Sequence, residues 1–147
     1  MVVTVLGEPL PVGEPLVFPW EGLYHPDAPQ VFSRTEDYLA WYRKPGPFVG
    51  LLFARNRWVN GTLAVEDALI RALEKRGFGV IPVFCYSLKD ESLGTKGPGE
   101  VVREFFCDPA GRPRIEALVR LLAFFLTARA RTDDFIREEV AGTALHC

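Results

Sequence analysis

The chain has 147 residues, 48% of them hydrophobic, which is typical of one globular domain with a buried core. Charged residues make up 24% and the formal net charge is only −2, so we expect no nucleic-acid or anionic-membrane partner. No apolar run approaches the roughly 20 residues that span a bilayer, and the N-terminus lacks a signal-peptide pattern. We therefore expect a cytoplasmic protein.

The three cysteines, Cys85, Cys107 and Cys147, lie far apart in the chain. Their number is odd and no two form a Cys-x-x-Cys pair. This spacing argues against a disulfide framework and against a structural zinc site.

Residues 7–30 contain six prolines and three glycines, which predict an extended arm with regular structure only in short pieces. Within the arm, residues 15–18 could form a short edge strand. Ser33 and Glu36 have the spacing of a capping box and predict a helix over about residues 34–43. The Pro-Gly-Pro run that follows should end this helix.

A strand, a helix and a second strand are predicted next. Residues 48–53 are an apolar run typical of a buried strand, and residues 63–76 carry apolar side chains at helical spacing. Thr62 is the expected helix cap, and the glycine after the helix suits a left-handed residue. Residues 80–84 are β-branched and apolar, which predicts the second strand. Pro82 lacks an amide donor and suggests an edge position or one unpaired side.

Two loops follow the carboxyl ends of these strands, at residues 54–61 and 85–90. A strand, helix, strand unit makes parallel strands, so both loops should lie at one edge of the sheet. Open α/β sheets usually hold their ligands at this edge. The first place to look for function is therefore the loop at 54–61.

The C-terminal third is less regular. Residues 101–106 predict a short helix and residues 108–111 a turn. Residues 115–126 fit either a buried helix or a short helix followed by a buried strand, and periodicity does not decide between them. Residues 132–140 have the start and body of a last helix.

The expected fold is a three-layer α/β fold, flavodoxin-like or Rossmann-like, with an incomplete parallel sheet. We expect a proline-rich arm plus a short helix over residues 1–46. An α/β domain should follow over residues 47–147, with a divergent tail after about residue 126.

Segments spread over about residues 15–126 share their order and spacing with a known family. They are GLYHPDAP at 22–29, YLAWY at 38–42, VGLLF at 49–53, WVNG at 58–61, DALI at 67–70, VIPVFCYSL at 80–88, FF at 105–106, GRP at 111–113, and residues 115–125. These segments resemble the large subunit of aerobic cobaltochelatase and the related H subunit of magnesium chelatase. The Trp-Val-Asn-Gly loop at 58–61 and the Cys-Tyr-Ser-Leu sequence at 85–88 look closer to the cobalt branch.

The resemblance implies an ATP-dependent chelatase that inserts cobalt into a corrin ring in cobalamin biosynthesis. The large subunit would bind the tetrapyrrole, while separate AAA+ motor subunits would hydrolyse ATP; the chain itself has no phosphate-binding loop motif. Cobalt and ATP are thus implied only through the assembly, and we expect no cofactor held by this chain. Family members are several times longer, so the resemblance implies an amino-proximal segment that is inactive alone. The alternative is a free-standing small-molecule or anion-binding module, and self-association is possible for either.

The ligand-binding candidates lie on the two loops at the expected sheet edge. The arginines and the asparagine could bind carboxylates, or the arginines could instead pair with local acids. The tryptophan could stack on a flat macrocycle, or pack onto its own domain. These candidates are Arg55, Arg57, Trp58, Asn60, Tyr86 and Ser87.

His25 is a candidate metal ligand, because a neutral imidazole coordinates metals well. The alternative is a structural histidine that only makes hydrogen bonds. No residue is identified as catalytic.

Overall fold

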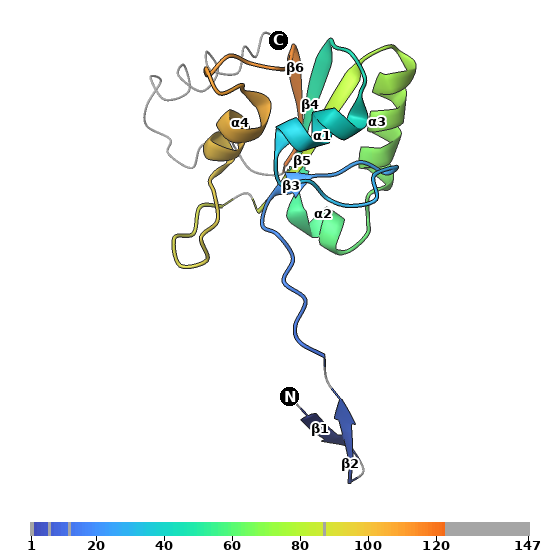
Figure 1. The fold of residues 1–147 in the computed structure, drawn as a ribbon, viewed down its shortest axis with the longest axis vertical. Coiled ribbons are helices and arrows are strands. Elements are labelled where there is room, and N and C mark those ends of the chain that lie inside the picture. The colour runs from blue at the N-terminus through green and yellow to red at the C-terminus, as the bar shows by residue number, and fades with distance from the viewer. Residues whose placement is uncertain (1, 6, 12, 87, 123–147) are drawn as a thin grey trace.

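A computed structural model describes residues 2–5, 7–11, 13–86 and 88–122. The elements, in chain order, are β1 (Val2–Val5), β2 (Glu8–Pro11), β3 (Gly22–Leu23), α1 (Thr35–Tyr42), β4 (Phe48–Ala54), α2 (Arg55–Val59), α3 (Ala64–Lys75), β5 (Gly79–Cys85), α4 (Pro98–Phe106) and β6 (Ala117–Leu121) (Figure 1). None of the described helices is long and apolar enough to cross a membrane.

The central sheet has four described strands in the order β3-β5-β4-β6. β4 pairs in parallel with both β5 and β6, while the short β3 pairs with β5 in the antiparallel direction. The predicted α/β class, the incomplete sheet and the parallel β4–α3–β5 unit are therefore confirmed.

Helices cover both faces of this sheet, which makes three layers. Alternate residues of a strand point to opposite faces, and the core divides accordingly. Leu52 and Ile81 belong to one apolar cluster with residues of α1 and α4, whereas Leu51 and Phe84 belong to a second cluster with Ile70 of α3. α1 is thus part of the same core as the sheet.

The predicted capping of α1 is wrong. The helix begins at Thr35 after Arg34, and no side chain caps its N-terminus. Thr35 is buried, and its hydroxyl donates instead to the carbonyl of Phe105 at 2.8 Å, which ties α1 to α4. The side chain of Glu36 pairs with Arg114, so a tertiary contact has replaced the local one.

Other local predictions have mixed outcomes. The residue before α3 is Leu63, without a side-chain cap, so the predicted cap at Thr62 is wrong. Gly77 has the predicted left-handed conformation, with φ of +89°. The structure has no strand at 15–18, and the loop after β4 contains the short helix α2.

The C-terminal predictions also differ in outcome. The short helix is confirmed as α4, and the turn at 108–111 is confirmed by a hydrogen bond from Gly111 N to Asp108 O. In residues 115–126, the strand of the second alternative is confirmed by β6, but it is only partly buried, and no helix lies within residues 115–122. Residues 123–126 and the predicted last helix lie outside the described residues.

β5 is not an edge strand, because it lies between β3 and β4. The other suggestion, one unpaired side, fits better. The carbonyl of Pro82 accepts the amide of Tyr24 at 3.0 Å, on the β3 side. Since the N–H and C=O of one strand residue point the same way, the missing donor of Pro82 also faces β3, which is only two residues long.

Two tyrosines of α1 complete this side of β5 beyond the end of β3. The amide of Val80 donates to the hydroxyl of Tyr42 at 3.1 Å, and the hydroxyl of Tyr38 donates to the carbonyl of Val80 at 2.8 Å. Both backbone groups of a fully buried residue are thereby satisfied by side chains.

β1 and β2 form a separate two-stranded antiparallel sheet. Figure 1 shows this hairpin at the far end of the arm, well away from the central sheet. The arm between them, residues 13–19, is exposed throughout.

Candidate functional site

The carboxyl ends of β4 and β5 lie side by side, with Ala54 in register with Cys85. The loops that follow them therefore meet at one edge of the sheet, as predicted. α2 begins directly after β4 and places the side chains of Arg55, Arg57 and Trp58 at this edge, and Tyr86 follows β5.

Arg55 fixes the arm to this edge. Its Nε donates to the carbonyl of Pro19 at 2.7 Å, and its Nη2 donates to the carbonyl of Phe18 at 3.1 Å. Its guanidinium also lies 4.4 Å from the ring centroid of Trp20, which is a cation–π contact. A contact with main-chain carbonyls 36 residues away has no signal in the sequence.

Arg57 pairs with a buried acid. Its Nε and Nη2 lie 3.1 and 3.3 Å from the two carboxylate oxygens of Glu66, which is only 1% exposed. This is the pairing with a local acid that the sequence left as an alternative. A buried carboxylate needs such a partner, so Arg57 holds α2 against α3.

Trp58 packs on its own domain in a stacked arrangement with Phe84, with ring centroids 4.4 Å apart and an interplanar angle of 11°. Phe18 meets it edge-on at 5.6 Å. Tyr86 is 38% exposed and meets Trp20 edge-on at 5.1 Å. Hence Phe18 and Trp20 of the arm each contact an aromatic side chain of the sheet edge, in two separate groups.

Asn60 is exposed at the end of α2, and Ser87 lies outside the described residues. Ligand binding by any of the six candidates stays a prediction.

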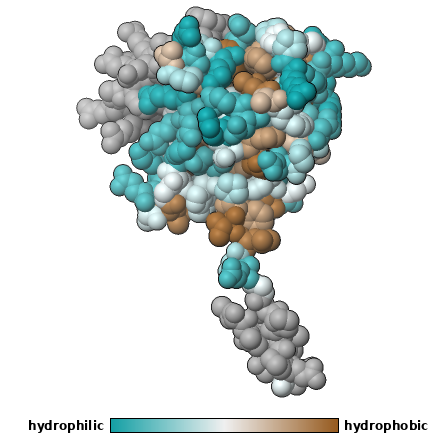
Figure 2. Space-filling model, viewed as in Figure 1, coloured by the Kyte–Doolittle hydropathy of each residue, from teal (hydrophilic) through white to brown (hydrophobic). Residues whose placement is uncertain are grey.

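Exposed apolar side chains come from the arm, from α2 and from the segment after β5. Val17 is 93% exposed and Leu16 is 82% exposed. We call this set the edge patch; its members are Leu16, Val17, Phe18, Val59, Tyr86 and Leu88. Figure 2 shows apolar surface where the arm leaves the globular part. Exposed apolar side chains at a sheet edge are typical of an interaction site.

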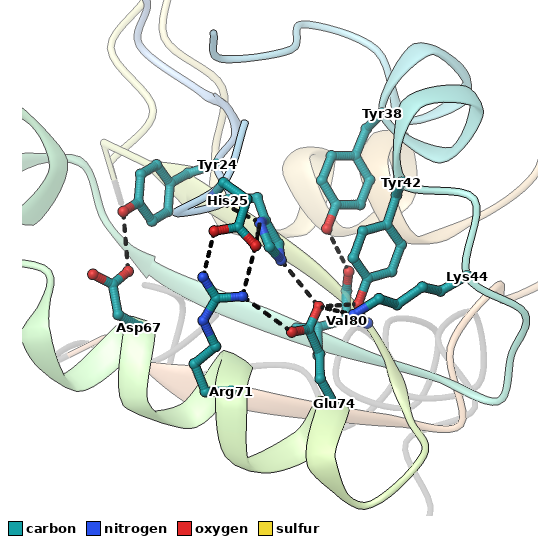
Figure 3. A network of polar contacts seen from close by, with 10 residues as sticks. Tyr24, His25, Tyr38, Tyr42, Lys44, Asp67, Arg71, Glu74 and Val80 are labelled. Atoms are coloured by element: carbon teal, nitrogen blue, oxygen red, sulfur yellow. Dashed lines mark hydrogen bonds and ion pairs between the residues drawn. The ribbon is translucent and has the colours of Figure 1, made fainter. Parts of the chain in front are cut away.

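His25 belongs to a polar network near the start of β5, at the opposite end of that strand (Figure 3). Its Nδ1 accepts the amide of Asp27 at 3.1 Å, so in the neutral ring Nε2 carries the proton and donates to Glu74 at 3.0 Å. His25 is 3% exposed. Both ring nitrogens have hydrogen-bonding partners, which supports the structural role.

Glu74 is the centre of this network. Its Oε1 accepts hydrogen bonds from Tyr42 at 2.7 Å and from His25, and lies 2.8 Å from Lys44 Nζ. Burial acts to raise the pKa of Glu74, but hydrogen bonds from Lys44, Tyr42 and His25 together lower it to about 2. Glu74 therefore stays ionised and joins α3 to the segment after β3 and to the end of α1.

The outer part of the network is made of Arg71 with Asp27 and of Tyr24 with Asp67. Burial, together with the 3.0 Å hydrogen bond to Asp67, raises the pKa of Tyr24 to about 12. Helical spacing could have indicated that Arg71 lies near Glu74, but the link from His25 spans 49 residues and sequence reasoning missed it. No group of three or more His, Cys, Asp or Glu side chains able to hold a metal ion occurs in the described part of the chain. Metal binding by His25 stays a prediction.

Comparison with known proteins identifies a family that matches nearly the whole chain. A family model described as CobN/Magnesium Chelatase matches residues 1–145. The uncharacterized protein MJ0908 of Methanocaldococcus jannaschii is 32% identical over 136 residues, which cover 85% of this chain and 11% of that protein.

Two further relatives carry a functional name. The chloroplastic ChlH subunit of magnesium chelatase from Oryza sativa subsp. indica is 29% identical over 145 residues, covering 90% of this chain and 10% of that protein. The H subunit of magnesium chelatase from Chlorobaculum parvum is 30% identical over 120 residues, covering 77% and 8%. The chain thus spans only about a tenth of the length of these relatives.

Proposed function

Because the chain belongs to the CobN/magnesium chelatase family, we propose that it forms part of a chelatase large subunit that binds a tetrapyrrole during metal insertion. The observation that carries the proposal is the family match over residues 1–145, together with relatives named as H subunits of magnesium chelatase. The finer proposal is the cobalt branch, with a corrin ring as substrate in cobalamin biosynthesis and cobalt as the inserted metal.

The carboxyl edge of the sheet suits such a ligand. A tetrapyrrole is a flat apolar ring with carboxylate arms, and the edge patch offers exposed apolar and aromatic side chains beside an arginine. Arg55 retains N–H donors beyond its two hydrogen bonds to the arm, and a guanidinium binds carboxylates well. We therefore propose Arg55 as the main carboxylate contact and Tyr86 as an apolar contact. Arg57 is the weaker candidate, because its charge and two of its nitrogens are already paired with Glu66.

ATP hydrolysis would belong to separate motor subunits. The sequence has no phosphate-binding loop motif, so this chain would supply binding surface and no ATPase step. The chain alone should then bind a tetrapyrrole without inserting metal.

Intrinsic tryptophan fluorescence tests the binding, because Trp20 and Trp58 both lie at the proposed edge. The chain would be titrated with hydrogenobyrinic acid diamide and, separately, with protoporphyrin IX. We expect saturable quenching, tighter with the corrin. Tighter binding of the porphyrin would favour the magnesium branch, and no change with either ring would refute the proposal.

Arg55→Gln should weaken tetrapyrrole binding by about tenfold, because that is the change in affinity expected when one hydrogen bond to a charged group is lost. Arg34→Gln is the matched control, because Arg34 is an exposed arginine at the start of α1. Equal affinities of the two variants would exclude Arg55 as the carboxylate contact. Metal insertion by the chain without motor subunits would contradict the proposed division of labour.

A further inference from the structure

The β1–β2 hairpin has one edge that can accept another strand, and we propose that this edge pairs with β1 of a second copy of the chain. The hairpin is a two-stranded sheet at the end of the arm. Two strands alone are marginally stable in water, and a third or fourth strand stabilises them. The proposal concerns a different part of the chain from the tetrapyrrole edge, so either can fail without the other.

The outer edge of β2 cannot donate hydrogen bonds. Pro9 and Pro11 have no N–H, so the donors from β2 to β1 must come from Glu8 and Leu10. Successive residues of a strand turn their backbone groups to opposite sides. Pro9 and Pro11 therefore face away from β1, and they block the outer edge of β2.

The outer edge of β1 is open by the same alternation. Val2 and Thr4 lie opposite Pro11 and Pro9 in the hairpin register, so their N–H and C=O groups face outward. Within the described residues, β1 pairs with β2 alone. β1 has the sequence VVTV, which is β-branched throughout, without proline and without charge.

These properties favour a second copy as the occupant. A symmetric antiparallel pair places the same uncharged strand against itself, so no like charges meet. The register with most hydrogen bonds sets Val2 opposite Thr4 of the second copy and puts the two-fold axis at Val3. The result is a four-stranded antiparallel sheet with proline-blocked outer edges.

Sedimentation velocity of the 147-residue chain over a wide concentration range tests the pairing. We expect a reversible dimer. Thr4→Pro removes an outward N–H and should weaken the dimer by about tenfold or more, whereas the matched variant Thr4→Ala keeps the N–H and should stay dimeric. A chain that is monomeric at every concentration overturns the proposal and leaves the edge to another polypeptide. A dimer that both variants affect equally also overturns it.

A cross-linking experiment tests the register without relying on a proline. In a Cys147→Ser background, Val3→Cys should form an intermolecular disulfide, because non-hydrogen-bonded antiparallel pairs bring Cα atoms to about 4.5 Å. Val5→Cys is the control, since its symmetry mate lies several residues away along the strand. Cross-linking of Val3→Cys no faster than Val5→Cys would overturn the proposed register and with it the β1–β1 pairing.

Discussion

The hydroxyl of Tyr42 makes two hydrogen bonds that a single substitution, Tyr42→Phe, removes. It accepts the amide of Val80 at 3.1 Å and donates to the carboxylate of Glu74 at 2.7 Å. The ring itself remains, so the packing of α1 on β5 should be preserved.

The loss in the free energy of unfolding comes from the two groups that lose their hydrogen bond to the hydroxyl. Val80 is fully buried, so its unpaired amide costs about 1–3 kcal/mol. Glu74 keeps Lys44 and His25, so the loss of one donor there adds about 1 kcal/mol. We expect Tyr42→Phe to lower the free energy of unfolding by about 2–4 kcal/mol.

Urea unfolding followed by tryptophan fluorescence measures this loss. Tyr86→Phe is the matched control, because Tyr86 is 38% exposed and its substitution should change stability by less than about 0.5 kcal/mol. Tyr38→Phe removes only the donor to the Val80 carbonyl and should give an intermediate loss. A Tyr42→Phe value within about 0.5 kcal/mol of the control would refute the reasoning that side chains complete the edge of β5.

Three further substitutions test the other interactions. Arg57→Gln should cost about 3 kcal/mol in urea unfolding, because it leaves Glu66 buried without its partner, and the double variant with Glu66→Gln should recover part of the loss. The lowered pKa of Glu74, about 2 against an ordinary 4.5, means that its stabilisation is complete above about pH 5 and is lost as the pH falls toward 2. Glu74→Gln should therefore flatten the acid limb of a stability–pH curve, and an unchanged limb would contradict the assignment. Gly50→Ala should cost about 1–3 kcal/mol, because its Cβ would lie 2.8 Å from the ring of Phe106; an unchanged melting temperature would show that α4 can move away.

The central part of the fold was predictable from the sequence because its signals are local. The apolar run of β4, the helical spacing of α3 and the left-handed glycine after it depend on a few neighbouring residues, and all three predictions are confirmed. The same holds for the meeting of two loops at the carboxyl edge, which follows from parallel strands.

The predictions that were wrong depend on contacts between residues far apart in the sequence. Thr35 gives its hydroxyl to Phe105, 70 residues away, and this contact competes with the helix cap that the local pattern favoured. Pro82 is a residue type expected on an edge strand, yet β5 lies inside the sheet. Its neighbour β3 has only two residues and leaves part of that side of β5 unpaired, which no local sequence pattern shows.

The candidate site was predictable in location but not in detail. The sequence indicated the loop after β4, yet it did not show that Arg57 is held by Glu66 or that Trp58 stacks on Phe84. Those partners come from α3 and β5, and only the folded arrangement brings them together.

Arg55 holds the arm in place through contacts that do not depend on which side chains the arm carries. Both acceptors are main-chain carbonyls, at residues 18 and 19, and a carbonyl is present whatever side chain the residue carries. The anchor therefore does not require particular side chains along residues 13–17, which can change while the backbone stays attached to the sheet edge. A designer could use these positions to vary the recognition surface without redesigning its support.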